Sequence, residues 1–330
     1  MEKLKWAISF LLAGSLIGLA GCSVQTSKEK VAHATEKQEK KMVKKDEPKK
    51  QQEEKLVIVN IIDPSTKTVI KTISPKDMGF KTDVEKYKAE IAKMAKDFAR
   101  GTKDNPGYDK RMILDKLDAN GQVIKGTPQT ILDEDELTGK ILQLSETGGN
   151  VEVPLYVTAS GYKVEDVSDL GETVVASYTT HFNSGIVGRS KNIALSAAAI
   201  NNVIVGVQDS FSYNTTVGPS DAAHGYQKAP EIQDGKLVDG YGGGICQTSS
   251  TLYNAIDQLA VSYIEKHHHS LHVGYVPEGR DATVSYGGKD FRFKNTTGVP
   301  FVLKAIVRKG SLTVEVRTSK AYKSLIKKAI

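Results

Sequence analysis

The stretch Gly242–Ala260, which reads GGGICQTSSTLYNAIDQLA, sets the expected fold of the second half of the chain. Three consecutive glycines lead into Ile245 and Cys246, and they can adopt positive φ or bring the backbone close to a ligand. Apolar residues then recur on one helical face, at Leu252, Tyr253, Ile256, Leu259 and Ala260. The pattern predicts a helix with a buried face, and it places Cys246 at the helix N-terminus.

A run of histidines follows this helix. Residues 267–272 read HHHSLH and continue as HVGYV, which predicts a strand. Alternation along that strand places His267 and His269 on one face, and His268 and His272 on the other. A cysteine that begins a helix, followed by a histidine on a strand, outlines the Cys/His arrangement of nucleophilic catalysis.

Three long motifs in this half of the chain resemble a VanW-family domain. They are FSYNTTVGP at 211–219, GGGICQTSSTLYNA at 242–255 and EKHHHSLHVGYVPEGRDATVSYG at 265–287. The resemblance covers roughly Glu172 to Arg317. The family is associated with cell walls and with some vancomycin-resistance clusters, so the resemblance implies a role at the cell envelope without fixing a reaction.

The histidine run departs from the family pattern at two positions. The usual family run is ERHPHS, whereas this chain has Lys266 in place of Arg and His268 in place of Pro. His267 and His269 match the pattern, so they remain the candidate functional histidines.

Thiol chemistry is the first hypothesis for this region. The unpaired N–H groups and the macrodipole at a helix N-terminus stabilise a thiolate, which would make Cys246 a nucleophile. His269 or His267 would act as the base, and Asp281 would orient the imidazole. The order of cysteine, histidine and acid resembles the papain and transglutaminase-like fold, which transfers no substrate.

Four further residues are predicted to bind the substrate. Backbone N–H groups near Gly243, Gly244 and Gln247 would hold an oxyanion. Arg280 would pair with a carboxylate, and the stem peptides of peptidoglycan carry several.

Two other interpretations of Cys246 stay open. In the first interpretation, Cys246 is a small buried side chain at a tight helix start, since free cysteines are among the most buried residues. In the second, Cys246 joins His267 and His269 in a three-ligand Zn²⁺ site. His267 and His269 have suitable spacing, but the sequence offers no second local ligand pair.

The N-terminus resembles a bacterial lipoprotein signal. An apolar run from Trp6 to Ala20 follows a short charged segment and ends in LAGC, residues 19–22. Residues 1–21 would be removed, and Cys22 would carry acyl chains that anchor the protein to the membrane on its extracytoplasmic face. Lipid on Cys22 leaves Cys246 as the second of only two cysteines, so no disulfide is expected.

The remaining chain divides into four predicted segments. Residues 22–55, rich in Lys, Glu and Gln, predict a disordered tether, with a charged helical stalk as the alternative. Residues 56–170 predict a small α+β domain, whose position resembles that of a peptidoglycan-binding domain often found before VanW domains. Residues 171–318 form the VanW-like region, and 319–330 form a basic tail.

The fold class expected for both regions is α+β, with a largely antiparallel sheet and a few packed helices. In the first region a hairpin is predicted around Asp63, followed by a helix that Thr82 caps and Gly101 ends. A second helix is predicted over residues 131–144, and residues 225–244 are expected to be a loop.

Composition restricts the functional classes only weakly. The 330 residues carry a net charge of +6, which is compatible with an anionic envelope, and nothing resembles a nucleic-acid motif. The sequence therefore predicts a cell-wall thiol enzyme (a peptidase, amidase or transpeptidase-like acyl transferase) that acts on peptidoglycan or its precursors without a cofactor. The alternative is a non-catalytic module that binds peptidoglycan. The sequence does not determine the oligomeric state.

Overall fold

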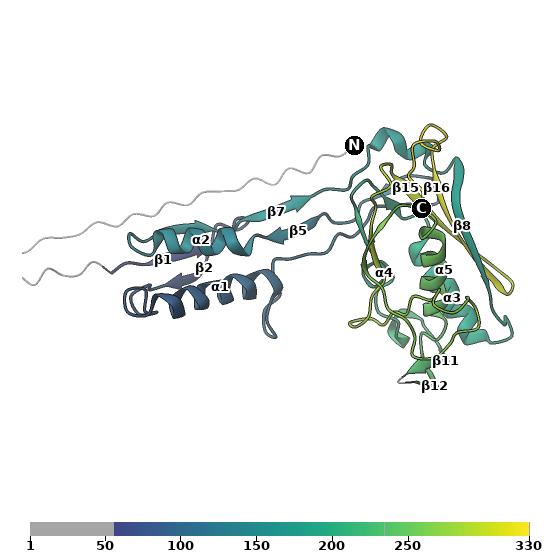
Figure 1. Cartoon of the computed structure of the whole chain (residues 1–330), viewed down its shortest axis with the longest axis horizontal. Coiled ribbons are helices and arrows are strands. Elements are labelled where there is room, and N and C mark those ends of the chain that lie inside the picture. Colours follow the sequence, from purple (N-terminus) through teal and green to yellow (C-terminus); the bar gives the residue numbers. More distant parts are fainter. Residues whose placement is uncertain (1–55, 234, 330) are drawn as a thin grey trace, which may run out of the picture. The chain divides into compact units, whose positions relative to one another are not determined.

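The computed structural model describes residues 56–233 and 235–329 (Figure 1). These residues belong to one compact unit, Lys55–Ile330. The predicted signal, Cys22 and the tether at 22–55 lie outside the described residues. Among the residues that are described, no helix is both long and apolar enough to span a membrane.

The first region is built from short strands and two helices. β1 pairs antiparallel with β2 and parallel with β6, and the hairpin predicted around Asp63 is confirmed. Helices α1 and α2 pack against each other and share a core with these strands, centred on Tyr87, Ile91 and Ile141. The elements are β1 (Val59–Ile62), β2 (Val69–Ile73), α1 (Val84–Arg100), β3 (Lys116–Leu117), β4 (Val123–Ile124), β5 (Gln129–Leu132), α2 (Glu134–Leu144), β6 (Gly149–Glu152) and β7 (Leu155–Thr158).

Two helix starts in this region differ from the prediction. Asp83 caps α1 by accepting a hydrogen bond from the Lys86 N–H, so the predicted cap at Thr82 is wrong by one residue. Helix α2 begins at Glu134 rather than at residue 131, because β5 pairs with β7 and Asp133 provides the cap. Gly101 ends α1 as predicted.

The second region is built on a four-stranded antiparallel sheet. Its strand order is β8-β16-β15-β9, and the strands are β8 (Thr173–His181), β9 (Ile204–Val205), β15 (Phe301–Arg308) and β16 (Ser311–Thr318). Helix α5 (Ile245–Ile256) packs against β8 and β16, and α3 (Val187–Ile200) packs against β15 and α5 (Figure 1). Alternate residues of β16 point into this core, as expected for a sheet covered on one face.

A second sheet closes the core on the side of an aromatic cluster. Its order is β10-β14-β13, with β10 (Ser210–Ser212), β13 (Ser262–Glu265) and β14 (Arg292–Lys294). Phe211 stacks on Phe293 at 5.0 Å between ring centroids, and Phe291 contacts Tyr253 of α5 edge-on at 5.8 Å. The α+β class with mostly antiparallel sheets is therefore confirmed, whereas the papain-like core stays a prediction.

The segment predicted as a loop contains a hairpin. β11 (Lys228–Gln233) and β12 (Lys236–Tyr241) pair antiparallel over residues that were expected to be irregular. The chain between them reads Asp-Gly, with Gly235 at φ 74°, and this dipeptide is a common hairpin signal.

The strand predicted from the histidine run is wrong. Residues 267–285 form no regular strand, and the predicted alternation of His268 and His269 fails because both side chains turn toward Asp281. The Thr283 N–H donates to the His267 carbonyl and holds the segment in a folded loop.

Residues on both sides of the predicted boundary at 170/171 share contacts. Met112 and Leu114 belong to the same apolar core as helix α5. Arg111 Nη1 lies 3.1 Å from the buried Asp290 carboxylate, and the Ile204 N–H donates to the Asp115 carbonyl at 2.9 Å. The division into two domains stays a prediction, and these contacts show that the 110–117 segment packs with the second region.

Candidate active site

Helix α5 is buried over nearly its whole length although half of its residues are polar. Gln247, Thr248, Ser249, Ser250 and Thr251 are each at most 1 % exposed. A buried polar side chain is costly unless it is hydrogen-bonded, and every one of these has a partner. The hydrogen bonds of these QTSST side chains therefore hold α5 to the surrounding elements.

The glycines before α5 are required by close packing. A Cβ at Gly243 would lie 2.4 Å from the carbonyl oxygen of Ala229 in β11. Gly244 caps the helix at φ 113°, a region that other residues rarely adopt. These two residues set Cys246 as the second residue of α5, as the sequence predicts.

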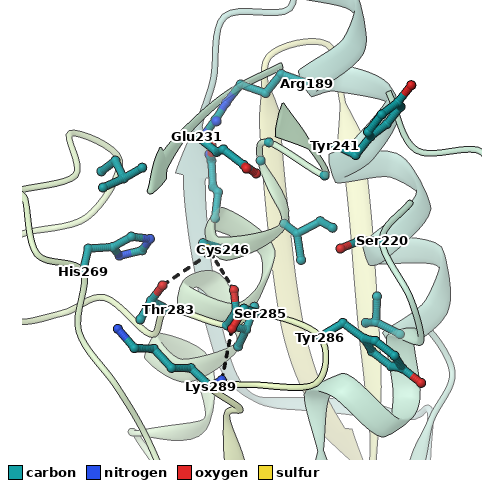
Figure 2. A pocket seen from close by; sticks show the side chains of 18 of the residues that line it. Arg189, Ser220, Glu231, Tyr241, Cys246, His269, Thr283, Ser285, Tyr286 and Lys289 are labelled. Atoms are coloured by element: carbon teal, nitrogen blue, oxygen red, sulfur yellow. Dashed lines mark hydrogen bonds between the residues drawn. The ribbon is translucent and has the colours of Figure 1, made fainter. Parts of the chain in front are cut away.

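Cys246 opens onto a cavity of about 870 Å³. Its side chain is partly buried, with Sγ 3.4 Å from the Val284 carbonyl oxygen and 3.6 Å from the Thr283 hydroxyl oxygen. Figure 2 shows His269 on one side of the thiol, with its imidazole pointing toward it. The cavity is lined by α5, by the loop after β13 and by the β11–β12 hairpin.

Asp281 fixes the orientation of His269. Its Oδ2 accepts hydrogen bonds from the His269 backbone N–H and from Nδ1, both at 2.7 Å. The His269 side chain is 7 % exposed and that of Asp281 is 9 % exposed. Because Nδ1 is bound to the carboxylate, Nε2 is the ring nitrogen left for Cys246.

Helix α5 in turn fixes Asp281. The Ala282 N–H donates to Ser250 Oγ at 2.9 Å, and Asn254 Nδ2 donates to the Arg280 carbonyl at 2.7 Å. Asp281 lies between these two anchored residues. The helix that carries the thiol therefore also positions the acid that orients the histidine.

The pKa values of the thiol and the imidazole move toward each other. Burial opposes ionisation of Cys246, but the hydrogen bond and charge of His269 hold the thiol pKa below its ordinary value of 9.0. Burial also opposes protonation of His269, but Cys246 and then Asp281 raise the imidazole pKa above 6.5. Each direction favours the charged form, the thiolate of Cys246 and the imidazolium of His269, over what the isolated side chain would have.

Asp281 remains charged in this environment. Burial alone would raise its pKa, but hydrogen bonds from His268 and from the N–H and ring of His269 lower it to about 2. His268 donates from Nδ1 to Oδ1 at 2.7 Å, so the residue that replaces the family proline adds a second imidazole to the same carboxylate.

The structure separates two predicted residues from the cavity. His267 bonds Glu265 at 2.9 Å and does not line the cavity, so it is not placed to act on Cys246. Arg280 is bound by Asp257 at 2.5 Å and lies over the ring of Tyr253, so its guanidinium is already neutralised. Within residues 56–233 and 235–329 no cluster of three or more His, Cys, Asp or Glu is arranged to hold a metal ion.

Most of the groups predicted to bind an oxyanion are already hydrogen-bonded within the protein. The Ile245 and Gln247 N–H groups donate to the carbonyls of Gly242 and Gly244, both at 3.0 Å. The Gln247 amide is bound to β8 and accepts from Arg189, so it is not free to bind a substrate. The N–H of Cys246 has no hydrogen-bond partner in the described part of the chain, and it remains the candidate donor.

Sequence reasoning missed three cavity residues. Arg189 of α3 reaches the cavity, Tyr275 lies under its guanidinium at 5.8 Å, and Thr283 contacts the thiol. Burial and then the charge of Cys246 raise the pKa of Tyr275. No sequence pattern around Arg189 or Thr283 indicates a place in the cavity. Tyr275 falls in the predicted strand, two residues beyond Val273.

The second region is thus an α+β fold with a cysteine, a histidine and an aspartate gathered near the start of a buried helix. Residues 188–317 match the sequence profile of the family described as "VanW like protein", so the C-terminal half carries a VanW domain. No solved structure matches the chain.

Two curated proteins are similar to this chain. The "Uncharacterized protein YoaR" of Bacillus subtilis (strain 168) is 40 % identical over 178 residues, which cover 54 % of this chain and 59 % of YoaR. The "Vancomycin B-type resistance protein VanW" of Enterococcus faecalis (strain ATCC 700802 / V583) is 28 % identical over 111 residues, which cover 32 % of this chain and 40 % of that protein. The chain therefore spans less than two thirds of the length of either relative.

Proposed function

We propose that this protein is a cysteine-dependent enzyme of the cell envelope that cleaves or transfers an amide bond of peptidoglycan peptides. The observation that supports this most directly is the Cys246, His269 and Asp281 arrangement, open to a cavity of about 870 Å³. The similarity to a vancomycin B-type resistance protein supports a cell-wall substrate and a link to glycopeptide sensitivity.

The chemistry would proceed through a thioester. The Cys246 thiolate attacks the amide carbonyl carbon, and the Cys246 N–H donates to the oxygen as it becomes negative. The C–N bond breaks, and the amine leaves with the proton of the His269 imidazolium. Water or a second amine then attacks the thioester while His269 accepts its proton, which releases the thiolate and completes hydrolysis or transfer.

The location belongs to the same proposal. Lipid on Cys22 would anchor the protein to the membrane on the extracytoplasmic face, and residues 22–55 would extend the catalytic region toward the wall. The first region, with α1 and α2, would contact peptidoglycan.

The test is the pH dependence of Cys246 alkylation, in the parent protein and in His269→Gln. We expect thiol reactivity at a pH below that of a free cysteine, and a shift to higher pH in His269→Gln. His267→Gln is the matched control, since this neighbouring histidine bonds Glu265 outside the cavity. Mass spectrometry of the protein with wall peptides would then detect the thioester.

A second function would follow from the opposite result. The contacts of Sγ with the Val284 carbonyl and the Thr283 hydroxyl are also what a purely structural cysteine would make. A thiol that reacts only after unfolding would reject the enzyme and favour a module that binds peptidoglycan without catalysis.

A further inference from the structure

Arg189 carries a positive charge into the cavity without an acidic partner. Its Nη2 donates to Gln247 Oε1 at 2.7 Å, and its guanidinium lies over Tyr275. No carboxylate among the described residues forms an ion pair with it. Burial lowers its pKa, and the charges that oppose this effect are those of Tyr275 and Cys246. A guanidinium in this state still has donors available for a ligand.

Glu231 carries a negative charge to the same cavity, also without a partner. It extends from β11 into the pocket drawn in Figure 2. Its carboxylate lies against the backbone of Gly240, where a Cβ would be only 1.9 Å from Oε1. Burial raises its pKa, and no donor or cation in the described chain acts against that effect.

The other charged groups of the cavity differ from these two. Asp221 is bound to His224 at 2.7 Å, and the side chain of Lys289 is exposed at the rim. Arg189 of α3 and Glu231 of β11 are thus partly buried opposite charges, and neither forms an ion pair within the described residues. Such groups are costly unless a ligand completes them.

We infer that the cavity binds a peptide that carries both a free carboxylate and a free primary amine, with the carboxylate at Arg189 and the ammonium at Glu231. Arg189 and Cys246 line the same cavity, so the carboxylate would lie near the bond that reacts. Planar guanidinium groups bind carboxylates through paired hydrogen bonds. This inference rests on the proposed function for the identity of the peptide, and it adds which charges the peptide must bear.

The test measures binding to the full chain carrying Cys246→Ala, which cannot form a thioester. The probes are a synthetic stem tetrapeptide with free carboxylates and a free side-chain amine, its amidated counterpart and its N-acetylated counterpart. Titration calorimetry gives each Kd. We expect amidation and acetylation each to weaken binding at least about tenfold, the loss expected for a charged hydrogen bond.

Two further variants assign each charge to its residue. Arg189→Gln should bind the free and amidated peptides within about twofold of each other, and Glu231→Gln should do the same for the free and acetylated peptides. Lys289→Gln and Asp239→Asn are the matched controls, because they remove the same charges from the cavity rim and from β12, and they should keep both preferences. Circular dichroism confirms that all variants are folded.

The outcomes separate this inference from the enzyme. Equal binding of the three peptides, or unchanged preferences in Arg189→Gln and Glu231→Gln, would overturn it even if the parent protein forms a thioester. Preferences that disappear as described would support it even if no thioester is ever detected, in which case only the proposed catalysis fails.

Discussion

Replacing Asp281 by Asn should remove the group that holds His269 in place. The resulting loss in the free energy of unfolding should depend on pH in a way set by the pKa of Asp281. In the folded chain that pKa is about 2, against an ordinary value of 3.8, because hydrogen bonds from His268 and His269 outweigh burial. At about 1.4 kcal/mol for each pKa unit, the charged state of Asp281 contributes about 2.5 kcal/mol to the free energy of unfolding.

The sign of the effect follows from a lowered pKa. The stabilisation is fully present above pH 3.8, where the unfolded chain is also ionised, and it is lost as the pH falls toward 2. Asp281→Asn should therefore lower the free energy of unfolding by about 2.5 kcal/mol at pH 6. At pH 3 the difference from the parent protein should shrink to about 1.3 kcal/mol, since the parent has lost part of the same contribution.

Urea unfolding followed by far-UV circular dichroism at pH 6 and pH 3 measures this difference. Asp239→Asn, on an exposed position of β12, is the control and should change stability by less than about 0.5 kcal/mol at either pH. A difference for Asp281→Asn that is equal at the two pH values, or that grows toward pH 3, would refute the view that this carboxylate is held ionised by its histidines.

Three further changes test other parts of the site. Gly243→Ala places a Cβ 2.4 Å from a carbonyl oxygen of β11, so we expect urea unfolding to show a free energy of unfolding lower by at least about 2 kcal/mol. An unchanged free energy of unfolding would show that the β11–β12 hairpin moves to accommodate the added methyl group. Arg280→Ala leaves Asp257 without its cation and should lower stability by about 1 kcal/mol while the pH profile of thiol alkylation stays unchanged; an altered profile would return Arg280 to the site. Ser250→Ala removes the acceptor of the Ala282 N–H and should cost about 1–3 kcal/mol and raise the pH at which the thiol reacts, whereas an unmoved pH profile would contradict the role of this hydrogen bond in positioning.

Elements with a clear local period could be predicted well. The buried face of α5, its start near Cys246 and the hairpin around Asp63 are all found where the sequence indicates them. Their errors are small and lie at the ends, as for the cap of α1. In each case neighbouring residues carry the signal, because the hydrogen bonds and the buried face belong to one short segment.

The conformation of residues 267–283 could not be predicted in the same way. Its histidines were assigned to alternate faces of a strand, whereas His268 and His269 both bind Asp281. The cause lies in α5, where Ser250 and Asn254 bind the backbone on either side of that aspartate. No period within the loop encodes contacts with residues of another element.

The sequence by itself determined the fold class, the helix that carries Cys246 and the presence of histidine and acid after it, because periodicity and helix-start signals are local. Only the tertiary structure decided which of these groups meet. It selected His269 over His267, and it placed Arg189 rather than Arg280 in the cavity, since Asp257 already neutralises Arg280. Which charge remains unpaired depends on contacts between distant segments, and those contacts are set when the helices pack on the sheet.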